Sequence, residues 1–377
     1  MEKISLAAVA IAVFMVGSVG TVQGEDMGFT KAFEGKSSDT EIEDGKRLSE
    51  SGSVRKNISP DGGTQEERQA PVPVPLILDT DMESDVDDVG ALAMLHALAD
   101  RGEIDLLGVM VGAENPWSTL CADRVNSYFN RPDLPLGRLK GDGEYRSSAY
   151  AKTIAEEFDG TLDSAEEAPC AVDQYRKLLA SQPDHSVIIL TIGYLTNLRN
   201  LLASEPDSHS DLNGQELVEQ KVKKWVCMGG QFPEGLESNI GRYEHEAAIE
   251  AINNWPTEII FSGWEIGRMD TGHDILDLPP SNPVRRAYEL FDRIPHKSWD
   301  QVATLFAARG LDDGPAAHYW EFSDPGYIEI EEAGDNAGYN RWVDDPEGTQ
   351  RYLRQVGSDD DIAEDINELM YHLPKGG

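Results

Sequence analysis

An acidic turn that follows an apolar run is the feature that most constrains how this chain folds. Residues 76–78 are apolar, and residues 89–98 are mostly apolar or small, as in a buried helix. The ten residues between these segments contain Glu83 and five aspartates, which are Asp79, Asp81, Asp85, Asp87 and Asp88. The order of strand, acidic turn and helix is typical of an open α/β sheet, in which ligands bind at the carboxyl ends of the strands.

Two interpretations of the turn differ in how many carboxylates they explain. Carboxylates this close together repel one another unless a cation neutralises them. The turn offers oxygen donors without Cys or His, which favours a hard ion such as Ca²⁺ or Mg²⁺. Alternatively, Asp85 or Asp87 caps the N-terminus of the following helix, where an anion is favourable. Capping explains one or two carboxylates rather than five, so we predict a metal site.

The rest of the chain predicts a mostly parallel sheet. The aromatic-rich alternation over 319–343 suggests β-hairpins. Four more apolar runs alternate with helical segments in the pattern of βαβ units, at 105–111, 186–192, 222–228 and 257–262. We therefore predict one α/β domain over 74–377, with an open, mostly parallel sheet flanked by helices and a Rossmann-like core. Neither a glycine-rich phosphate loop nor a Gly-x-Ser-x-Gly turn follows any of these runs, which argues against phosphate cradling and serine hydrolysis.

The N-terminus has the features of an export signal. Lys3 precedes a largely apolar run over 4–19, and small or polar residues follow it. We predict a cleaved signal peptide over 1–24, a disordered acidic linker over 25–73, and export to the periplasm or the extracellular space. The alternative is a retained membrane anchor, but the run is short for a span of about 20 apolar residues. We expect no stable membrane insertion after cleavage.

The charge of the chain restricts its partners. Asp and Glu number 69 against 32 Lys and Arg, which gives a formal net charge of −37. A nucleic-acid partner requires a basic face, so we expect none. The three cysteines are too sparse for a disulfide scaffold. The sequence is compatible with a homo-oligomer.

Several segments, taken in order, resemble the inosine–uridine-preferring nucleoside hydrolase family. They are Leu-Asp-Thr-Asp…Asp-Val-Asp-Asp at 78–88, Gly-Tyr-Leu-Thr-Asn at 193–197, Met-Gly-Gly at 228–230, Glu-Ser-Asn-Ile at 237–240 with Glu-Ala-Ala at 246–248, and Trp-Asp at 299–300. The resemblance covers about residues 74–345. It implies an α/β fold, a bound Ca²⁺, and hydrolysis of the N-glycosidic bond of a nucleoside or a related ribosyl compound.

The resemblance also implies roles for the residues around the ion. Asp81, Asp88 and Asp300 match the calcium-ligating aspartates, and a backbone carbonyl, which we expect to be that of Ile192, completes the protein ligands. Asp87 matches the carboxylate that takes a proton from the calcium-bound water. The Ca²⁺ lowers the pKa of that water, so a carboxylate can finish its deprotonation at neutral pH.

A second group of residues is implied for the sugar. Asn115, Glu237 and Asn239 match the residues that bind the ribose hydroxyls, and Asp79 matches an aspartate that supports the turn. Cleavage of an N-glycosidic bond builds oxocarbenium character on the ribose, so anionic groups near the ring stabilise the transition state.

Two departures from the family pattern bear on catalysis. The turn is two residues longer than the commonest pattern, with Met82 and Glu83 in place of Pro-Gly, so Asp85 is an additional carboxylate that could compete as a ligand. The usual His-Asp pair of the family is Trp299-Asp300 here, and that histidine is thought to help protonate the leaving base. Trp299 is no acid, but it could stack on a purine or pack in the core.

Three functional hypotheses follow, and we favour the first. It is a calcium-dependent hydrolase that acts on a small ribosyl substrate. The second is a non-catalytic, calcium-dependent protein that binds a sugar or nucleoside, which the absent histidine favours and Asp87 disfavours. The third is a hydrolase of a different glycosidic or acylated sugar. If another side chain replaces the family histidine as acid, the candidates on the loop after Asn239 are Arg242, Tyr243 and His245.

Overall fold

The structure is a computed structural model that describes residues 72–312 and 314–375. The expected signal peptide at 1–24, and the expected linker up to residue 71, therefore lie outside the described residues. Within the described part, no helix combines the length and the hydrophobicity needed to cross a membrane.

A long sheet organises the described chain, and most of it is parallel. Its strands run in the order β3-β2-β1-β4-β5-β7-β13-β11-β12-β6. Every neighbouring pair from β3 to β13 in this order is parallel, which confirms the predicted fold class. These strands are β1 (Val74–Thr80), β2 (Ile104–Val111), β3 (Leu136–Arg138), β4 (Val187–Thr191), β5 (Val222–Met228), β7 (Glu258–Ser262) and β13 (Gln350–Gln355).

The C-terminal strands differ in part from the prediction. β11 (Gly326–Ile330) and β12 (Asn340–Asp344) pair antiparallel, as expected of a hairpin. β10 (Trp320–Phe322) does not pair with β11, as a hairpin over the turn between them would require, and lies antiparallel to β13 instead. The prediction of successive hairpins is therefore wrong for β10. The reason is β13, a strand that the sequence analysis missed and that provides the partner for β10.

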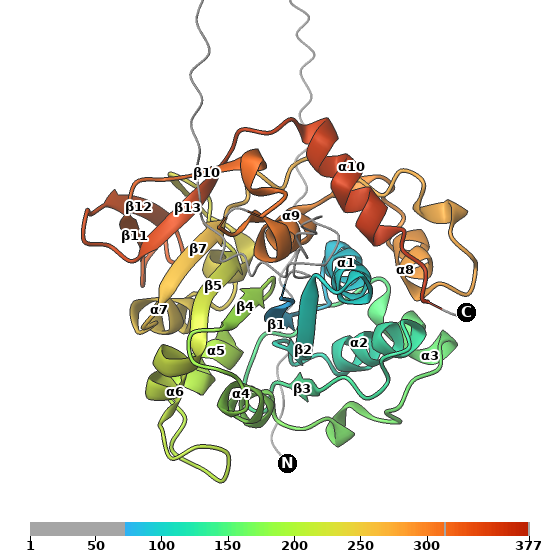
Figure 1. The fold of residues 1–377 in the computed structure, drawn as a ribbon, viewed down its shortest axis with the longest axis horizontal. Coiled ribbons are helices and arrows are strands. Elements are labelled where there is room, and N and C mark those ends of the chain that lie inside the picture. The colour runs from blue at the N-terminus through green and yellow to red at the C-terminus, as the bar shows by residue number, and fades with distance from the viewer. Residues whose placement is uncertain (1–71, 313, 376–377) are drawn as a thin grey trace, which may run out of the picture. The chain divides into compact units, whose positions relative to one another are not determined.

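Two hydrophobic cores cover the two faces of the sheet. Successive residues of a strand point to opposite faces, so Leu76 and Leu78 pack in one core and Ile77 in the other. Figure 1 shows the helices of the first core at the upper right and those of the second at the lower left. The first set includes α1 (Asp87–Arg101), α8 (Pro283–Phe291), α9 (Trp299–Leu305) and α10 (Asp359–Met370), and the second α4 (Ala171–Ala180), α5 (Thr196–Leu202), α6 (Gly214–Lys221) and α7 (His245–Asn253).

The connectivity of the sheet places the acidic turn at a topological switch point. The chain proceeds from β1 outward to β2 and β3, and then crosses to β4, on the other side of β1. A crevice forms at the carboxyl ends of the strands where the order reverses, and ligands of open α/β sheets bind there. The turn that follows β1 opens into this crevice.

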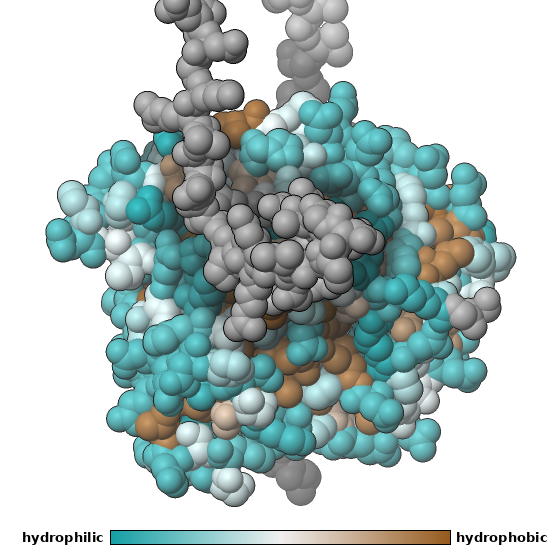
Figure 2. Space-filling model, in the orientation of Figure 1, coloured by the Kyte–Doolittle hydropathy of each residue, from teal (hydrophilic) through white to brown (hydrophobic). Residues whose placement is uncertain are grey.

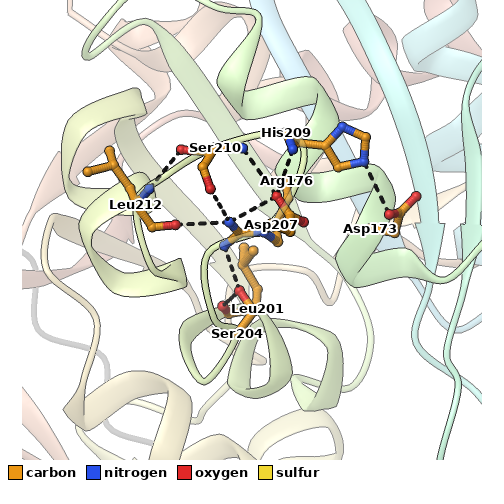
Figure 3. Close-up of polar contacts among 8 residues, drawn as sticks. All are labelled: Asp173, Arg176, Leu201, Ser204, Asp207, His209, Ser210 and Leu212. Carbon is orange, nitrogen blue, oxygen red and sulfur yellow. Dashed lines mark hydrogen bonds and ion pairs between the residues drawn. The ribbon is translucent and has the colours of Figure 1, made fainter.

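The visible surface of the described residues is largely polar. Most of the described surface visible in Figure 2 is hydrophilic, with smaller apolar areas between. Figure 3 shows an acidic cluster, called the Arg176 cluster below, that contains Asp173, Asp207 and His209. In it, Arg176 of α4 contacts Asp207 on the loop between α5 and α6. This cluster provides an internal comparison for the candidate site.

Candidate functional site: an acidic cavity at the switch point

The backbone of the acidic turn fixes two of its own carboxylates. The N–H of Glu83 donates to Asp81 Oδ1 at 3.0 Å, and the N–H of Met82 donates to Asp88 Oδ1 at 3.1 Å. The Thr80 hydroxyl also donates to Asp88. Asp81 and Asp88 are therefore held in position by local hydrogen bonds before any ligand is bound.

Segments far apart in the sequence meet this turn. The N–H of Asp300, at the start of α9, donates to Asp87 Oδ2 at 3.2 Å. One carboxylate oxygen from each of Asp87, Asp88 and Asp300 lies within 4.8 Å of the others. The carbonyl of Ile192, one residue after β4, lies 3.3 Å from the side-chain nitrogen of Asn239. The structure thus brings together predicted ion-site residues from three separate segments and a predicted sugar-binding residue, Asn239, from a fourth.

These residues line a cavity of about 140 Å³. Pockets for drug-sized ligands usually measure about 300–1,000 Å³, so a whole nucleoside would extend beyond this cavity. A leaving group would extend toward the mouth. The lining residues are Asp81, Ser84, Asp85, Asp87, Asp88, Ile192, Met228, Glu237, Ser238, Asn239, Trp264, Trp299 and Asp300.

The cavity concentrates buried negative charge without a basic partner. Among residues 72–312 and 314–375, no Lys, Arg or His side chain forms an ion pair with a carboxylate that lines it. Burial raises the pKa of Asp81, Asp87 and Asp300 well above the usual range, and neighbouring carboxylates raise it further. Burial also raises the pKa of Asp88 to about 7. A cation bound among these oxygens would remove the repulsion, and the donor set fits a hard divalent ion.

Asp79 lies behind the cavity and supports the turn. Its carboxylate accepts a hydrogen bond from the Tyr175 hydroxyl at 2.9 Å and another from the Asn197 side chain at 3.2 Å. Burial raises its pKa to about 7, although both hydrogen bonds act in the opposite direction. Asp79 does not line the cavity, which agrees with a supporting role rather than a contact with ligand.

The predicted sugar-binding residues are placed in two different environments. Glu237 and Asn239 line the cavity, and the Glu237 carboxylate accepts the N–H groups of Gly230, Asn239 and Ile240. Asn115 lies outside the cavity lining. Its side chain caps α2 (Pro116–Tyr128) and donates to the carbonyl of Arg146 at 3.1 Å. The structure therefore brings Glu237 and Asn239, but not Asn115, to the acidic cluster.

Comparisons with known proteins show the family to which the chain belongs. The sequence model of the inosine-uridine preferring nucleoside hydrolase family matches residues 76–274, more than half of the chain. The chain belongs to this family. Family members are metal-dependent hydrolases that act on N-glycosyl compounds. The matched range contains the acidic turn, Ile192, Glu237 and Asn239, and it ends before Trp299 and Asp300.

Solved structures of nucleoside hydrolases share the fold of this nucleoside hydrolase family member. A plant nucleoside hydrolase has 16% sequence identity and a TM-score of 0.60, over 79% of this chain and 99% of that chain. A purine-preferring ribonucleoside hydrolase from Gardnerella vaginalis has 16% identity and a TM-score of 0.59, also over 79% and 99%. The type III effector XopQ, solved with adenosine diphosphate ribose, has 15% identity and a TM-score of 0.58, over 81% and 94%. No curated protein sequence gives a significant match.

Trp299 lines the cavity of this nucleoside hydrolase, but its polar atom is already engaged. Its ring stacks on that of Trp264, with the centroids 6.4 Å apart, and its indole N–H donates to the Trp264 carbonyl at 2.9 Å. The pair therefore presents an aromatic wall to a ligand rather than a proton donor.

The alternative acids lie elsewhere in the described structure. Arg242, Tyr243 and His245 are absent from the lining of the acidic cavity. The guanidinium carbon of Arg146 lies over the Tyr243 ring, 4.0 Å from the ring centroid. His245 Nε2 lies 3.3 Å from the Glu332 carbonyl oxygen. The geometry does not bring any of the three to the cavity.

Sequence reasoning gave no assigned role to three contributors to the site. Trp264 follows β7 and completes the aromatic wall, but a single tryptophan in sequence is equally typical of a core. Glu83 is fully buried and accepts a hydrogen bond from the N–H of Arg146 at 2.9 Å, so it fastens the loop around 146 to the acidic turn. His296 lies beside Asp85 and Asp87. Its only signal in the sequence is its position four residues before Asp300.

Proposed function

We propose that this protein is a calcium-dependent hydrolase that cleaves the N-glycosidic bond of a nucleoside or a related ribosyl compound. One observation supports this most strongly. Asp87, Asp88 and Asp300 converge at the switch point of the sheet, where they are buried and have no basic partner among residues 72–312 and 314–375. A structural role alone gives no reason to bury three unneutralised carboxylates, since an unpaired buried charge is destabilising.

In the proposed reaction, the residues divide into ligands, a base and a sugar cradle. Asp81, Asp88, Asp300 and the Ile192 carbonyl would hold the Ca²⁺, which when bound supplies a water of lowered pKa and coordination for sugar hydroxyls. Asp87 would accept the proton of the attacking water, and the Asp300 N–H keeps its Oδ2 oriented.

The sugar side of the cavity would stabilise positive charge that develops on the ribose. Glu237 and Asn239 would bind the hydroxyls, and the surrounding carboxylates would stabilise the oxocarbenium-like transition state. Asn115 stays a proposed hydroxyl ligand only if the loop around 146, which holds its side chain, moves. The Trp264–Trp299 wall would contact the leaving group at the mouth.

A direct assay tests this proposal. The full chain should hydrolyse p-nitrophenyl riboside in Ca²⁺, and hydrolysis should stop in chelator and in Asp88→Asn. Because no described residue of the lining is an evident acid for the leaving group, the nitrophenyl riboside, whose phenolate leaves without a proton, should react ~10²–10⁴ times faster than inosine or uridine. Comparable rates would show that an acid exists. Absence of hydrolysis on all substrates would overturn the proposal.

A second candidate function rests on the same missing acid. A protein that binds a ribosyl ligand with Ca²⁺, without turnover, requires the ion and sugar residues but no proton donor. Binding of ribose, inosine or adenosine diphosphate ribose that depends on Ca²⁺, together with no product after long incubation, would favour it. The structure of XopQ with adenosine diphosphate ribose makes that compound a useful probe.

The proposed setting is outside the cytoplasm. We propose that residues 1–24 direct export to the periplasm or extracellular space, and that a small ribosyl compound is the physiological ligand. Comparison of the mature N-terminus with the encoded one, together with the molecular mass in solution, would test cleavage and any homo-oligomer.

A further inference from the structure

A histidine that the proposed reaction does not use lies against the acidic turn. His296, on β9 (His296–Lys297), has a 9% exposed surface, and its Nε2 is buried without a hydrogen-bond partner. Its ring packs edge-on against Phe291 and Trp299, with centroids 4.8 and 6.0 Å apart. A buried ring nitrogen without a partner is destabilising unless a ligand completes its contacts.

Two carboxylates beside His296 offer further oxygen atoms that could bind a metal ion. One ring nitrogen of His296 and one carboxylate oxygen from each of Asp85 and Asp87 lie within 4.8 Å of one another. Asp87 also belongs to the neighbouring group with Asp88 and Asp300. Two candidate cation positions therefore share one carboxylate, as in centres that hold two ions side by side.

We propose that Asp85, Asp87 and His296 form a second cation site, distinct from the calcium position, that takes a divalent transition-metal ion. An imidazole nitrogen with two carboxylates suits ions such as Zn²⁺, Co²⁺ or Mn²⁺, whereas Ca²⁺ prefers oxygen donors alone. Asp87, the proposed base, would then also be a ligand of the second ion. Because a carboxylate that binds a cation is a weaker base, occupancy of the second site would slow a reaction that uses Asp87 to accept a proton.

The protonation state of His296 is compatible with metal binding. Burial lowers its pKa, and Arg293 and Lys297 act in the same direction, while Asp85 and Asp270 oppose them. A neutral imidazole is the form that binds a metal. Donors about 2.0–2.2 Å from one ion lie within about 4.4 Å of one another, which is close to the spacing of these ligand atoms. Asp85 is half-buried on the turn, so its side chain has room to rotate.

A second group of the same composition serves as the control. Asp173, Asp207 and His209 also offer two carboxylates and an imidazole within 4.8 Å. There, however, Arg176 already neutralises Asp207, and His209 Nε2 lies 3.2 Å from Asp173. We expect this group to bind transition metals weakly, because Arg176 already neutralises Asp207 and His209 Nε2 is already paired with Asp173.

Cobalt titration of the full chain, without an affinity tag and saturated with Ca²⁺, tests the proposal. Calorimetry and visible absorption should detect one equivalent of Co²⁺ with mixed nitrogen and oxygen ligands. His296→Asn and Asp85→Asn should each weaken this binding at least ~10-fold. His209→Asn should bind Co²⁺ as the parent protein does. Asp85 is half-buried, so Asp85→Asn keeps the test valid if His296→Asn does not fold.

The outcomes separate this inference from the proposed function. Cobalt binding that is absent, or that is lost in His209→Asn but not in His296→Asn or Asp85→Asn, would overturn the second site. If Ca²⁺ binding and riboside hydrolysis persist in that case, the proposed function stands. Conversely, cobalt binding that depends on His296 in a protein that neither binds Ca²⁺ nor hydrolyses ribosides would support the second site and overturn the proposed function.

Discussion

Two acidic clusters in this fold, one around Arg176 and one in the cavity, differ in whether a basic side chain neutralises their carboxylates. In the first, Arg176 donates to both oxygens of Asp207 and to the carbonyls of Ser210 and Leu212, so one buried cation neutralises the charge and organises the loop (Figure 3). The hydrogen bond from Arg176 is the main reason that the pKa of Asp207 falls to about 2.

The second cluster, in the cavity, lacks any such partner among the described residues. Burial raises the pKa of Asp88 to about 7, in the opposite direction from that of Asp207. The difference shows that the chain uses arginine where an acidic loop is structural. Where the described residues provide no cation, a bound metal ion would supply it, and this is the physical argument for a metal site at the switch point.

Replacing one aspartate of each cluster by asparagine should show the largest difference between the two clusters. Asp87→Asn should retain calcium and ribose binding but lower hydrolysis ~10²–10⁴-fold, because the amide cannot accept the proton of the attacking water. Asp207→Asn should leave the rate unchanged. Steady-state rates on p-nitrophenyl riboside, with calcium binding measured by calorimetry, check both. Parent-like turnover by Asp87→Asn would show that Asp87 is not the base.

Removal of the internal cation should affect stability rather than activity. Arg176 has a 2% exposed side chain, and Arg176→Met would leave Asp207 and two loop carbonyls without their donor. We expect the free energy of unfolding in urea to fall by about 3 kcal/mol. Lys223→Met, at the exposed pair with Asp312, is the matched control and should cost less than about 1 kcal/mol. Equal losses in the two variants would contradict the role given to Arg176.

The residues of the cavity cluster differ in how far the sequence predicted them. Asp81, Asp87 and Asp88 stand together on one turn after an apolar run, so composition and periodicity alone predicted a cation site there. Trp299 and Asp300 could be joined to it only through a family resemblance, because contacts over two hundred residues leave no local pattern.

Other features could not be predicted from the sequence, because they depend on the direction of a side chain or on the pairing of distant strands. β13 reads Gln-Arg-Tyr-Leu-Arg-Gln, with only two apolar residues in six, and it is a strand because β7 and β10 pair with it. Asn115 has a side chain suited to a sugar, but its role as a helix cap became visible only in the structure. The sequence predicted the parallel sheet because buried parallel strands are continuously apolar, and β13 lacks that signature.

Calcium removal should destabilise the protein through the cavity alone. A ligand that binds only the folded state stabilises it by about 2.7 kcal/mol when present at about 100 times its Kd. We therefore expect chelator to lower the Tm by several degrees and Ca²⁺ to restore it, and Asp88→Asn should lose this response. Arg176→Met should keep it, because its defect lies in the other cluster. An unchanged Tm in chelator, with no metal in elemental analysis, would argue against the ion site.

The smallest expected effect is the pH dependence of calcium affinity. It distinguishes the two clusters because the pKa of Asp88 is raised, whereas that of Asp207 is lowered. Burial raises the pKa of Asp88 to about 7, so below that pH a proton competes with the ion. Apparent affinity should fall as the pH is lowered through 7, by up to tenfold per pH unit, or about 1.4 kcal/mol, for each displaced proton.

The metal-free protein should show the opposite trend in stability. A carboxyl whose pKa is higher in the folded than in the unfolded state binds its proton more tightly when folded, so stability is greatest at low pH and declines as pH rises through 7. Asp207, whose pKa is lowered to about 2, stabilises the fold above the unfolded pKa of about 3.9 and loses this contribution only as the pH falls toward 2. Calcium affinity from calorimetry, and the Tm in chelator, should therefore change between pH 6 and 8. This change reflects titration in the cavity and not in the Arg176 cluster. Calcium affinity that is constant over this range would show that Asp88 is already ionised without the ion.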